Sequence, residues 1–387
     1  MMNIYDYLKW RGDLSFKADP FNIVDSLLFS YIIYTDFREV LWADESITLE
    51  EAARRLFEIH TEEELLNVGS LIDNAPIVMR RMSETKRFRN VRISHYINRV
   101  DEKYTEQFSA AHFEIDPHTS YISLCGTDDT MVGWKEDFKM SYETIAAQKS
   151  SADYVNTTAS KLFHKYYIGG HSKGGNLAYY AGMMAKPAVK KKIINVYSFD
   201  GPALAQHTID LELYGQIKDR MIKVIPEFSV FGLLYDTPVE DGKTVVKSSS
   251  NLFWEHDPVS WQVIANDFEK GSLSKDCLLI QDGLYDFLDT MNIEQRKNFV
   301  DEVFRAFDKA GIKKVSNITR QTAASVMKIM REMVHVSDDT KKAFVKLVQI
   351  YGSIISEKAE GAIKTMAKEK YEILTEFIKA KTKKQAA

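Results

Sequence analysis

The sequence predicts an α/β protein with a mostly parallel sheet flanked by helices and a helical C-terminal region. Helical patterns occupy residues 1–89, strand and helix patterns alternate over 90–270, and strand signals fade after Trp261. Alternating strands and helices are typical of parallel βαβ units, whose crossover helices cover both faces of a sheet. We therefore expect a sheet-containing domain over residues 1–270 and a helical region over 271–387.

Composition restricts the class of protein further. The chain has 387 residues, of which 45% are hydrophobic, and its 51 basic and 55 acidic residues give a formal net charge of −4. This content supports a large core, and the near balance of charge argues against a nucleic-acid binder. Two distant cysteines, no secretory signal and no apolar run long enough to cross a bilayer predict a soluble protein of the reducing cytoplasm. The sequence sets no oligomeric state.

The first half of the chain supplies helices and then strands. Apolar residues over 20–37 recur at helical spacing, and Thr48 with Glu51 and Thr61 with Glu64 are capping boxes of the next helices. Runs rich in β-branched and aromatic residues predict strands over 91–99, 104–115, 120–124, 165–168, 192–199 and 222–225. Segments 230–235 and 244–247 are expected to form a hairpin.

The last part of the chain reads as helices over 293–308, 320–334 and 338–379. Its lysine-rich end is compatible with peripheral contact with an anionic membrane. A helix packed on the core with a frayed basic end is the favoured interpretation.

One sequence motif is typical of a catalytic site. Residues 170–174, Gly-His-Ser-Lys-Gly, fit the pattern G-x-S-x-G, with an apolar strand before it and a helix start after it. Strand, sharp turn and helix are the setting of a nucleophile elbow, where glycines avoid clashes around a strained serine. We therefore predict Ser172 as the nucleophile.

A serine nucleophile needs a base and an orienting acid. His256, in a loop after the last predicted strand of the sheet, is preferred as the base over His207. Asp200 ends the strand after the elbow helix, and parallel strands present their carboxyl ends to one rim, so Asp200 is the first choice for the acid. Glu227 and nearby Asp236 are the rivals.

An oxyanion hole needs two backbone N–H groups, one of them from the residue after the nucleophile, Lys173. The second is expected from Thr127, in the loop after the strand at 120–124, where Gly126 allows close backbone approach. Residues 128–151 are either a lid over an acyl pocket or a plain connecting helix. No cofactor and no metal site are expected. His112, Asp116 and His118 are interpreted as residues in and near a turn and not as metal ligands.

Several motifs together resemble a bacterial α/β-hydrolase family defined by a domain of unknown function and similar to the fungal-type (class three) lipases. They are residues 124–128, 133–138, 170–178, 196–202 and 256–261, and the opening residues 7–13 and the helical tail look like it as well. The resemblance implies a lipase-like serine esterase with Ser172 as nucleophile, His256 as base, and Thr127 and Lys173 as oxyanion donors. The sequence departs from the pattern in two ways: Cys125 replaces the usual Arg, and Phe228-Ser229 stands where fungal-type lipases carry the acid.

The expected function is hydrolysis of an acyl ester or lipid through an acyl-enzyme. The alternative is a catalytically silent α/β-hydrolase scaffold that binds a partner through its helical C-terminal region.

Overall fold

The computed structural model describes residues 2–42, 44–66, 72–235, 242–314, 328–329 and 331–358. The chain divides into two compact units, Met1–Ser274 and Lys275–Ala387. We propose that these units are the two domains expected from the sequence. The first carries every candidate site residue.

The described residues of the first unit form an eight-stranded sheet in the order β1 to β8. Strands β1 to β4 pair antiparallel, whereas β4 to β8 pair parallel. The bounds are β1 Ile47–Thr48, β2 Arg92–Asp101, β3 Glu106–Asp116, β4 Thr119–Leu124, β5 Lys165–His171, β6 Ile193–Phe199, β7 Met221–Pro226 and β8 Thr244–Val246. A separate pair joins β9 Val263–Ile264 to β10 Asp267–Phe268. The expected α/β fold with a mostly parallel sheet is confirmed.

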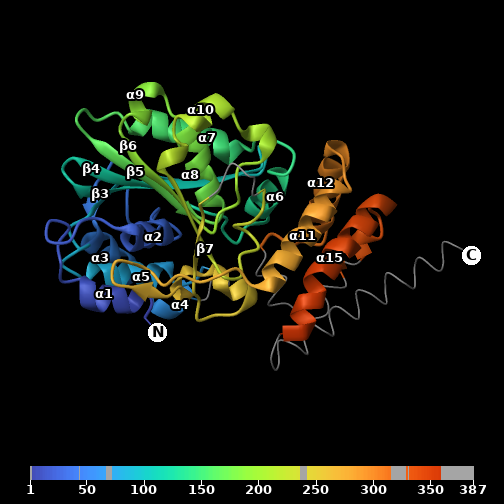
Figure 1. The fold of residues 1–387 in the computed structure, drawn as a ribbon, viewed down its shortest axis with the longest axis horizontal. Helices are drawn as coiled ribbons and strands as arrows, with labels where there is room; N and C mark the ends of the chain where they lie inside the picture. Colours follow the sequence, from blue (N-terminus) through green and yellow to red (C-terminus); the bar gives the residue numbers. More distant parts are fainter. Residues whose placement is uncertain are drawn as a thin grey trace, which may run out of the picture. The chain divides into compact units, whose positions relative to one another are not determined.

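Helices cover both faces of this sheet (Figure 1). Their bounds are α1 Ile4–Arg11, α2 Ile23–Ile32, α3 Leu49–Ile59, α4 Glu62–Leu66, α5 Ala75–Ser83, α6 Met131–Lys139, α7 Ala146–Thr158, α8 Lys173–Met184, α9 Pro187–Lys190 and α10 Leu211–Gly215. Helices α1, α2, α3 and α5 build one core with one sheet face, and α7 and α8 build a second core with the other. Because successive strand residues point to opposite faces, Tyr121 lies in the first core and Ile122 in the second.

Local sequence signals mark several element ends correctly. The Thr48 hydroxyl accepts the Glu51 N–H at the start of α3, and Thr61 and Glu64 form the reciprocal pair at α4. At the turn between β3 and β4, the Asp116 carboxylate accepts the His118 N–H at 2.7 Å. The box at Thr61 and the turn at Asp116 are confirmed, whereas at Thr48 only the hydroxyl cap forms, because the Glu51 carboxylate accepts from Arg54 and Arg55 instead.

The expected hairpin is wrong. Residues 230–235 form turns, and Thr244–Val246 is β8, which pairs parallel to β7. Glu240, Asp241 and Gly242 are expected from the sequence to form the turn of this hairpin; Glu240, Asp241 and also Asp236 lie outside the described residues. A parallel partner requires the chain to cross over, which the apolar pattern of two short segments does not reveal.

The second unit contains α11 Lys275–Asp289, α12 Ile293–Lys309 and α15 Asp338–Lys358 among its described residues. Asn292 caps α12 by accepting the Gln295 N–H, and the helix expected over 293–308 is present. Most of the helix expected over 320–334 and the lysine-rich end lie outside the described residues.

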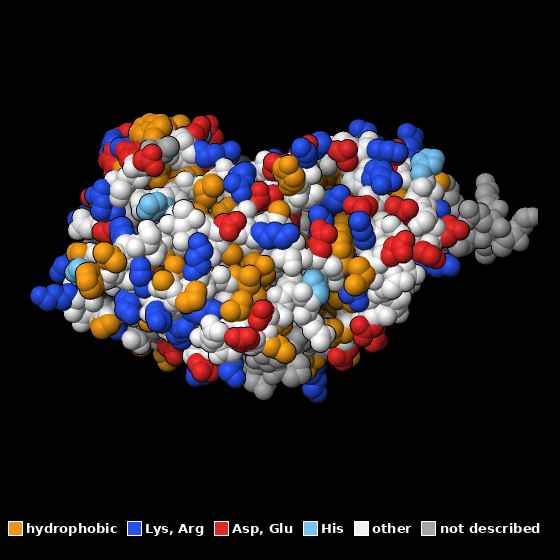
Figure 2. Space-filling view, turned by 90° about the horizontal axis from the view of Figure 1, so that it is seen from above, with side chains coloured by type: hydrophobic (Ala, Val, Ile, Leu, Met, Phe, Trp, Pro, Cys, Tyr) orange, Lys and Arg blue, Asp and Glu red, His pale blue; other side chains and the backbone are white. Residues whose placement is uncertain are grey.

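On the face shown in Figure 2, side chains of both charges are interspersed, consistent with the small net charge of −4. Among the helices that the structure describes, none combines the length and the apolar character needed to cross a membrane.

Candidate active site

The predicted elbow is a tight turn between β5 and α8. Ser172 stands between them with φ 56° and ψ −132°, a strained conformation for a residue with a side chain, and it is partly exposed. A Cβ on Gly174 would lie 2.1 Å from the Leu124 carbonyl oxygen, and one on Gly170 would lie 2.4 Å from the same atom. Both positions therefore require glycine for the elbow to lie against the end of β4.

The elbow is joined to the end of the neighbouring strand. The Ser172 N–H donates to the Phe199 carbonyl at 2.9 Å, in continuation of the β5–β6 pairing that aligns His171 with Phe199. Asp200 follows Phe199, so it lies on the rim that carries Ser172. A Cβ on Gly201 would lie only 2.6 Å from the Ser172 carbonyl oxygen.

Asp200 and His256 form a buried pair. His256 Nδ1 lies 2.5 Å from Asp200 Oδ2, and the two residues are 5% and 0% exposed. The other carboxylate oxygen of Asp200 accepts the Ser229 hydroxyl and, at 3.2 Å, the Gly232 N–H. These donors hold the carboxylate toward the imidazole, which leaves His256 Nε2 as the nitrogen free to exchange a proton.

The backbone of His256 is held by its surroundings. His256 ends the 3₁₀ helix η4 Leu252–His256, and His171 Nε2 donates to its carbonyl oxygen at 2.8 Å. The Phe231 ring lies against the imidazole with centroids 4.4 Å apart. Because both contacts come from other elements, they restrict rotation of the imidazole and shift of its backbone.

Glu255 braces the segment that supports Asp200. Its side chain accepts the Phe228 N–H at 2.9 Å, next to Ser229. Burial, reinforced by the negative charges of Glu227 and Asp200, raises the pKa of Glu255 to about 7. A carboxyl group with a pKa near neutrality therefore adjoins the His256–Asp200 pair.

Within the part of the chain that the structure describes, the Ser172 hydroxyl makes no hydrogen bond with the His256 imidazole. Such bonds are often long in sites without substrate and shorten when substrate binds. The two residues are nevertheless linked through His171, which precedes Ser172 and whose ring centroid lies 4.5 Å from that of His256.

The rival acids and base lie elsewhere. The Glu227 carboxylate accepts the Ser272 N–H at 3.3 Å, and His207 is exposed in the 3₁₀ helix η1 Gln206–Thr208. Asp257 accepts the Tyr31 hydroxyl at 3.0 Å, and burial raises its pKa to about 6. The structure thus brings His256 together with Asp200 rather than with Glu227.

The expected oxyanion loop lies against the elbow. The Cys125 N–H donates to the Ser109 carbonyl at 2.8 Å, and a Cβ on Gly126 would lie 2.6 Å from the His171 carbonyl oxygen. The Thr127 hydroxyl donates to Asp137 Oδ2 at 2.5 Å. The loop is therefore braced by backbone and by α6 in spite of the Cys125 departure.

Asp137 itself is an unusual acid. Its Oδ1 is buried without a hydrogen-bond partner and lies 4.0 Å from Lys173 Nζ, although 26% of the side chain is exposed. Burial raises the pKa of Asp137 to about 7 against the opposing effects of Lys173 and Thr127.

Sequence reasoning missed several supporting residues. From the sequence, the side chains of His171 and Lys173 were assigned no part in the site, and Ser229 was noted only where fungal-type lipases carry the acid. The place of Ser229, shortly after β7 ends at Pro226, was the available signal, because the loops that follow parallel strands form the rim that carries the site. The contacts of His171 and Lys173 depend on elements distant in sequence.

Within the described residues, no group of three or more His, Cys, Asp or Glu side chains is arranged to hold a metal ion.

The sheet, its flanking helices and the elbow define a lipase-like α/β-hydrolase fold. A family model described as Mbeg1-like matches residues 82–305, more than half of the chain, and the protein belongs to this lipase-like family. The expected resemblance to a lipase-like α/β-hydrolase family is thereby confirmed. No curated protein sequence matches the chain. Among solved structures, that of M37 lipase is similar, with 12% identity and a TM-score of 0.32 over 55% of this chain and 69% of that chain.

Proposed function

We propose that the protein is a serine hydrolase that cleaves carboxylic acyl esters through an acyl-enzyme, with Ser172, His256 and Asp200 as its triad. The observation that carries the proposal is the buried His256–Asp200 pair, at 2.5 Å, on the rim that also carries the strained Ser172. If His256 had only a structural role, a nucleophile elbow beside it would not be needed. If the turn had no catalytic role, a strained backbone at Ser172 would not be needed.

In this mechanism His256 Nε2 accepts the Ser172 proton while the hydroxyl oxygen attacks the ester carbonyl. Asp200 fixes the tautomer with the proton on Nδ1 and stabilises the imidazolium that forms. The N–H groups of Thr127 and Lys173 stabilise the developing oxyanion. His256 then protonates the leaving alcohol, and water hydrolyses the acyl-enzyme by the same steps.

The substrate class is an acyl ester, including lipid esters, because aromatic side chains lie on and near the His256 segment. Phe231 lies against His256, and Phe253 packs edge-on against Phe228 at 5.5 Å between centroids. We place the activity in the cytoplasm, a proposal supported by two buried free cysteines, Cys125 and Cys277.

A fluorophosphonate probe tests this function. We expect the folded wild type to be labelled and Ser172→Ala to remain unlabelled, because the probe reacts only with an activated serine. A folded wild type that is not labelled, and that hydrolyses none of a panel of acyl esters, would contradict the proposal and favour the silent scaffold.

A further inference from the structure

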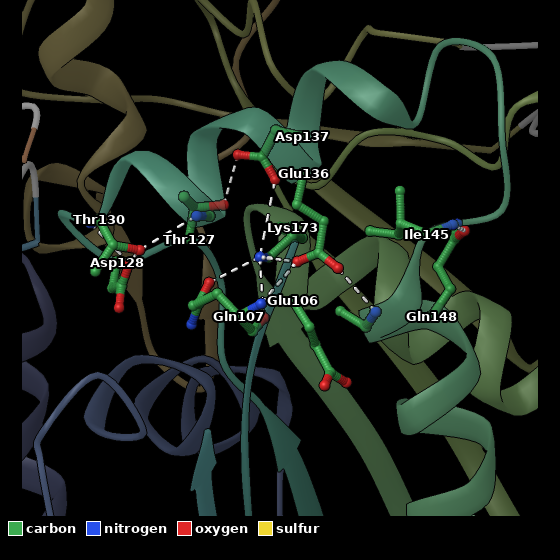
Figure 3. A network of polar contacts seen from close by, with 12 residues as sticks. Glu106, Gln107, Thr127, Asp128, Thr130, Glu136, Asp137, Ile145, Gln148 and Lys173 are labelled. Atoms are coloured by element: carbon green, nitrogen blue, oxygen red, sulfur yellow. Dashed lines mark hydrogen bonds and ion pairs between the residues drawn. The ribbon is translucent and has the colours of Figure 1, made fainter. Parts of the chain in front are cut away.

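A buried ion pair lies beside the nucleophile elbow (Figure 3). Lys173 Nζ lies 3.0 Å from Glu136 Oε2, and the two side chains are 1% and 0% exposed. The ammonium also donates to the carbonyl oxygen and the side-chain Oε1 of Gln107, at 3.1 and 2.7 Å. Its three donors are thus used inside the protein, so the ammonium cannot bind a substrate anion.

Glu136 connects α6 to three other elements. Its Oε2 accepts the Gln107 N–H at 3.1 Å as well as the Lys173 ammonium, and its Oε1 accepts the Ala147 N–H at 2.8 Å. Gln107 belongs to β3, Ala147 lies in the first turn of α7, and Lys173 opens α8. One carboxylate therefore fastens α6 to the sheet and to both neighbouring helices.

Helix α6 in turn holds the oxyanion loop. A Cβ on Gly133 would lie 3.0 Å from Thr127 Cγ2, and the Thr127 hydroxyl bonds to Asp137. On the other side of the loop, a Cβ on Gly174 would lie 3.0 Å from the Gly126 nitrogen. The loop is enclosed between α6 and the elbow, and the Lys173–Glu136 pair ties these two elements together.

We propose that Lys173 and Glu136 are positioning residues whose ion pair holds the oxyanion loop against the elbow, so that α6 is a fixed wall of the site and not a moving lid. This inference rests on the proposed function and names the physical state of its substrate. With both oxyanion donors in place before binding, the enzyme acts on dissolved, monomeric acyl esters and needs no lipid–water interface to open it.

The first test uses the wild type alone. The rate of hydrolysis of a p-nitrophenyl acyl ester is measured across its critical micelle concentration. We expect the rate of hydrolysis to saturate with the concentration of monomeric ester and to show no sudden increase at the critical micelle concentration. A several-fold increase in rate at that concentration would overturn the inference that α6 is a fixed wall of the site.

The second test removes both charges at once, because removing one leaves an unpaired buried charge that threatens folding. Lys173→Met/Glu136→Gln keeps the length of both side chains. We expect the rate of fluorophosphonate labelling and kcat to fall about 10- to 100-fold, with KM within about twofold, because oxyanion donors act in the transition state. Labelling at the wild-type rate by the folded double variant would overturn the positioning role.

A matched control separates positioning from general loss of stability. Arg87 and Asp25 form another buried ion pair, with both side chains 0% exposed, between the segment after α5 and helix α2. Asp25→Asn/Arg87→Met should therefore lower the melting temperature while leaving labelling of Ser172 near the wild-type rate. If the control variant lost labelling as much as the test variant, the effect of removing the Lys173–Glu136 pair would be explained by lower stability, and the inference would be overturned. A wild type that is not labelled overturns the proposed function, and the inference with it.

Discussion

The imidazole of His171 donates a hydrogen bond from Nε2 to the main-chain carbonyl oxygen of His256, at 2.8 Å. Because a carbonyl only accepts, this bond assigns the proton to Nε2 and leaves Nδ1 facing the Tyr34 hydroxyl at 3.1 Å. Burial, together with the nearby His256, holds the pKa of His171 well below its usual range, so that the ring stays neutral. The residue before the proposed nucleophile therefore fixes the backbone of the proposed base.

Replacing His171 should misplace His256. In His171→Phe the carbonyl loses its donor, and we expect kcat to fall about tenfold or more, because small misplacements in a site cost rate steeply. Stability should fall by about 1–3 kcal/mol from the unsatisfied carbonyl. His171→Gln, whose amide is able to donate to the same carbonyl, is the control and should recover part of kcat. Equal kinetics for the two variants would contradict this role.

The Asp200 carboxylate should matter far more than that of Glu227. Asp200→Asn preserves shape but loses the charge that holds the His256 tautomer, and we expect kcat to fall about 10³- to 10⁴-fold. Glu227→Gln should retain kcat within about threefold, because its side chain bonds to Ser272. Steady-state kinetics on one soluble ester compares them. A larger loss for Glu227→Gln would reverse the assignment of the acid.

Glu255 should make stability depend on pH in a defined direction. Its pKa is raised from 4.5 to about 7 in the folded protein, so between these values the folded state binds more protons than the unfolded state. Stability from this group is therefore complete below about pH 4.5 and decreases as the pH rises to about 7, by about 3 kcal/mol in total.

The variant Glu255→Gln removes that titration and retains an oxygen that accepts the Phe228 N–H. Urea unfolding at intervals from pH 5 to pH 8 should show the variant gaining on the wild type as the pH rises. Curves that stay parallel across this range would show that Glu255 does not titrate there.

Gly174 should tolerate no side chain. In Gly174→Ala the new methyl group meets the Leu124 carbonyl oxygen, which is main chain and cannot rotate away. We expect a loss of about 1–3 kcal/mol in unfolding free energy, as for other overpacked sites, and slower probe labelling. Gly215→Ala, at the end of α10 with nothing within 4 Å of the added carbon, is the control. It should be neutral or stabilise by up to about 1 kcal/mol. Equal urea midpoints for both variants would contradict the close packing of the elbow.

Several features were predictable from the sequence because their causes are local. The Thr48 cap, the capping box at Thr61, the turn at Asp116 and the elbow around Ser172 each depend on residues within a few positions of one another. Strand order was predictable in part, because short connections place consecutive strands side by side. The sequence by itself therefore determined the fold class and the position of Ser172 between β5 and α8.

Tertiary structure alone decided which polar side chains meet. Asp200 and His256 are 56 residues apart, Lys173 and Glu136 are 37 apart, and His171 reaches a carbonyl 85 residues away. The sequence left Asp200 and Glu227 both open as acids, because both follow strands whose ends face one rim. The direction of the parallel strands places both carboxylates at the same edge of the sheet. The packing of the loops decides which of them comes within hydrogen-bonding distance of His256. That packing depends on many distant side chains at once, which no local pattern encodes.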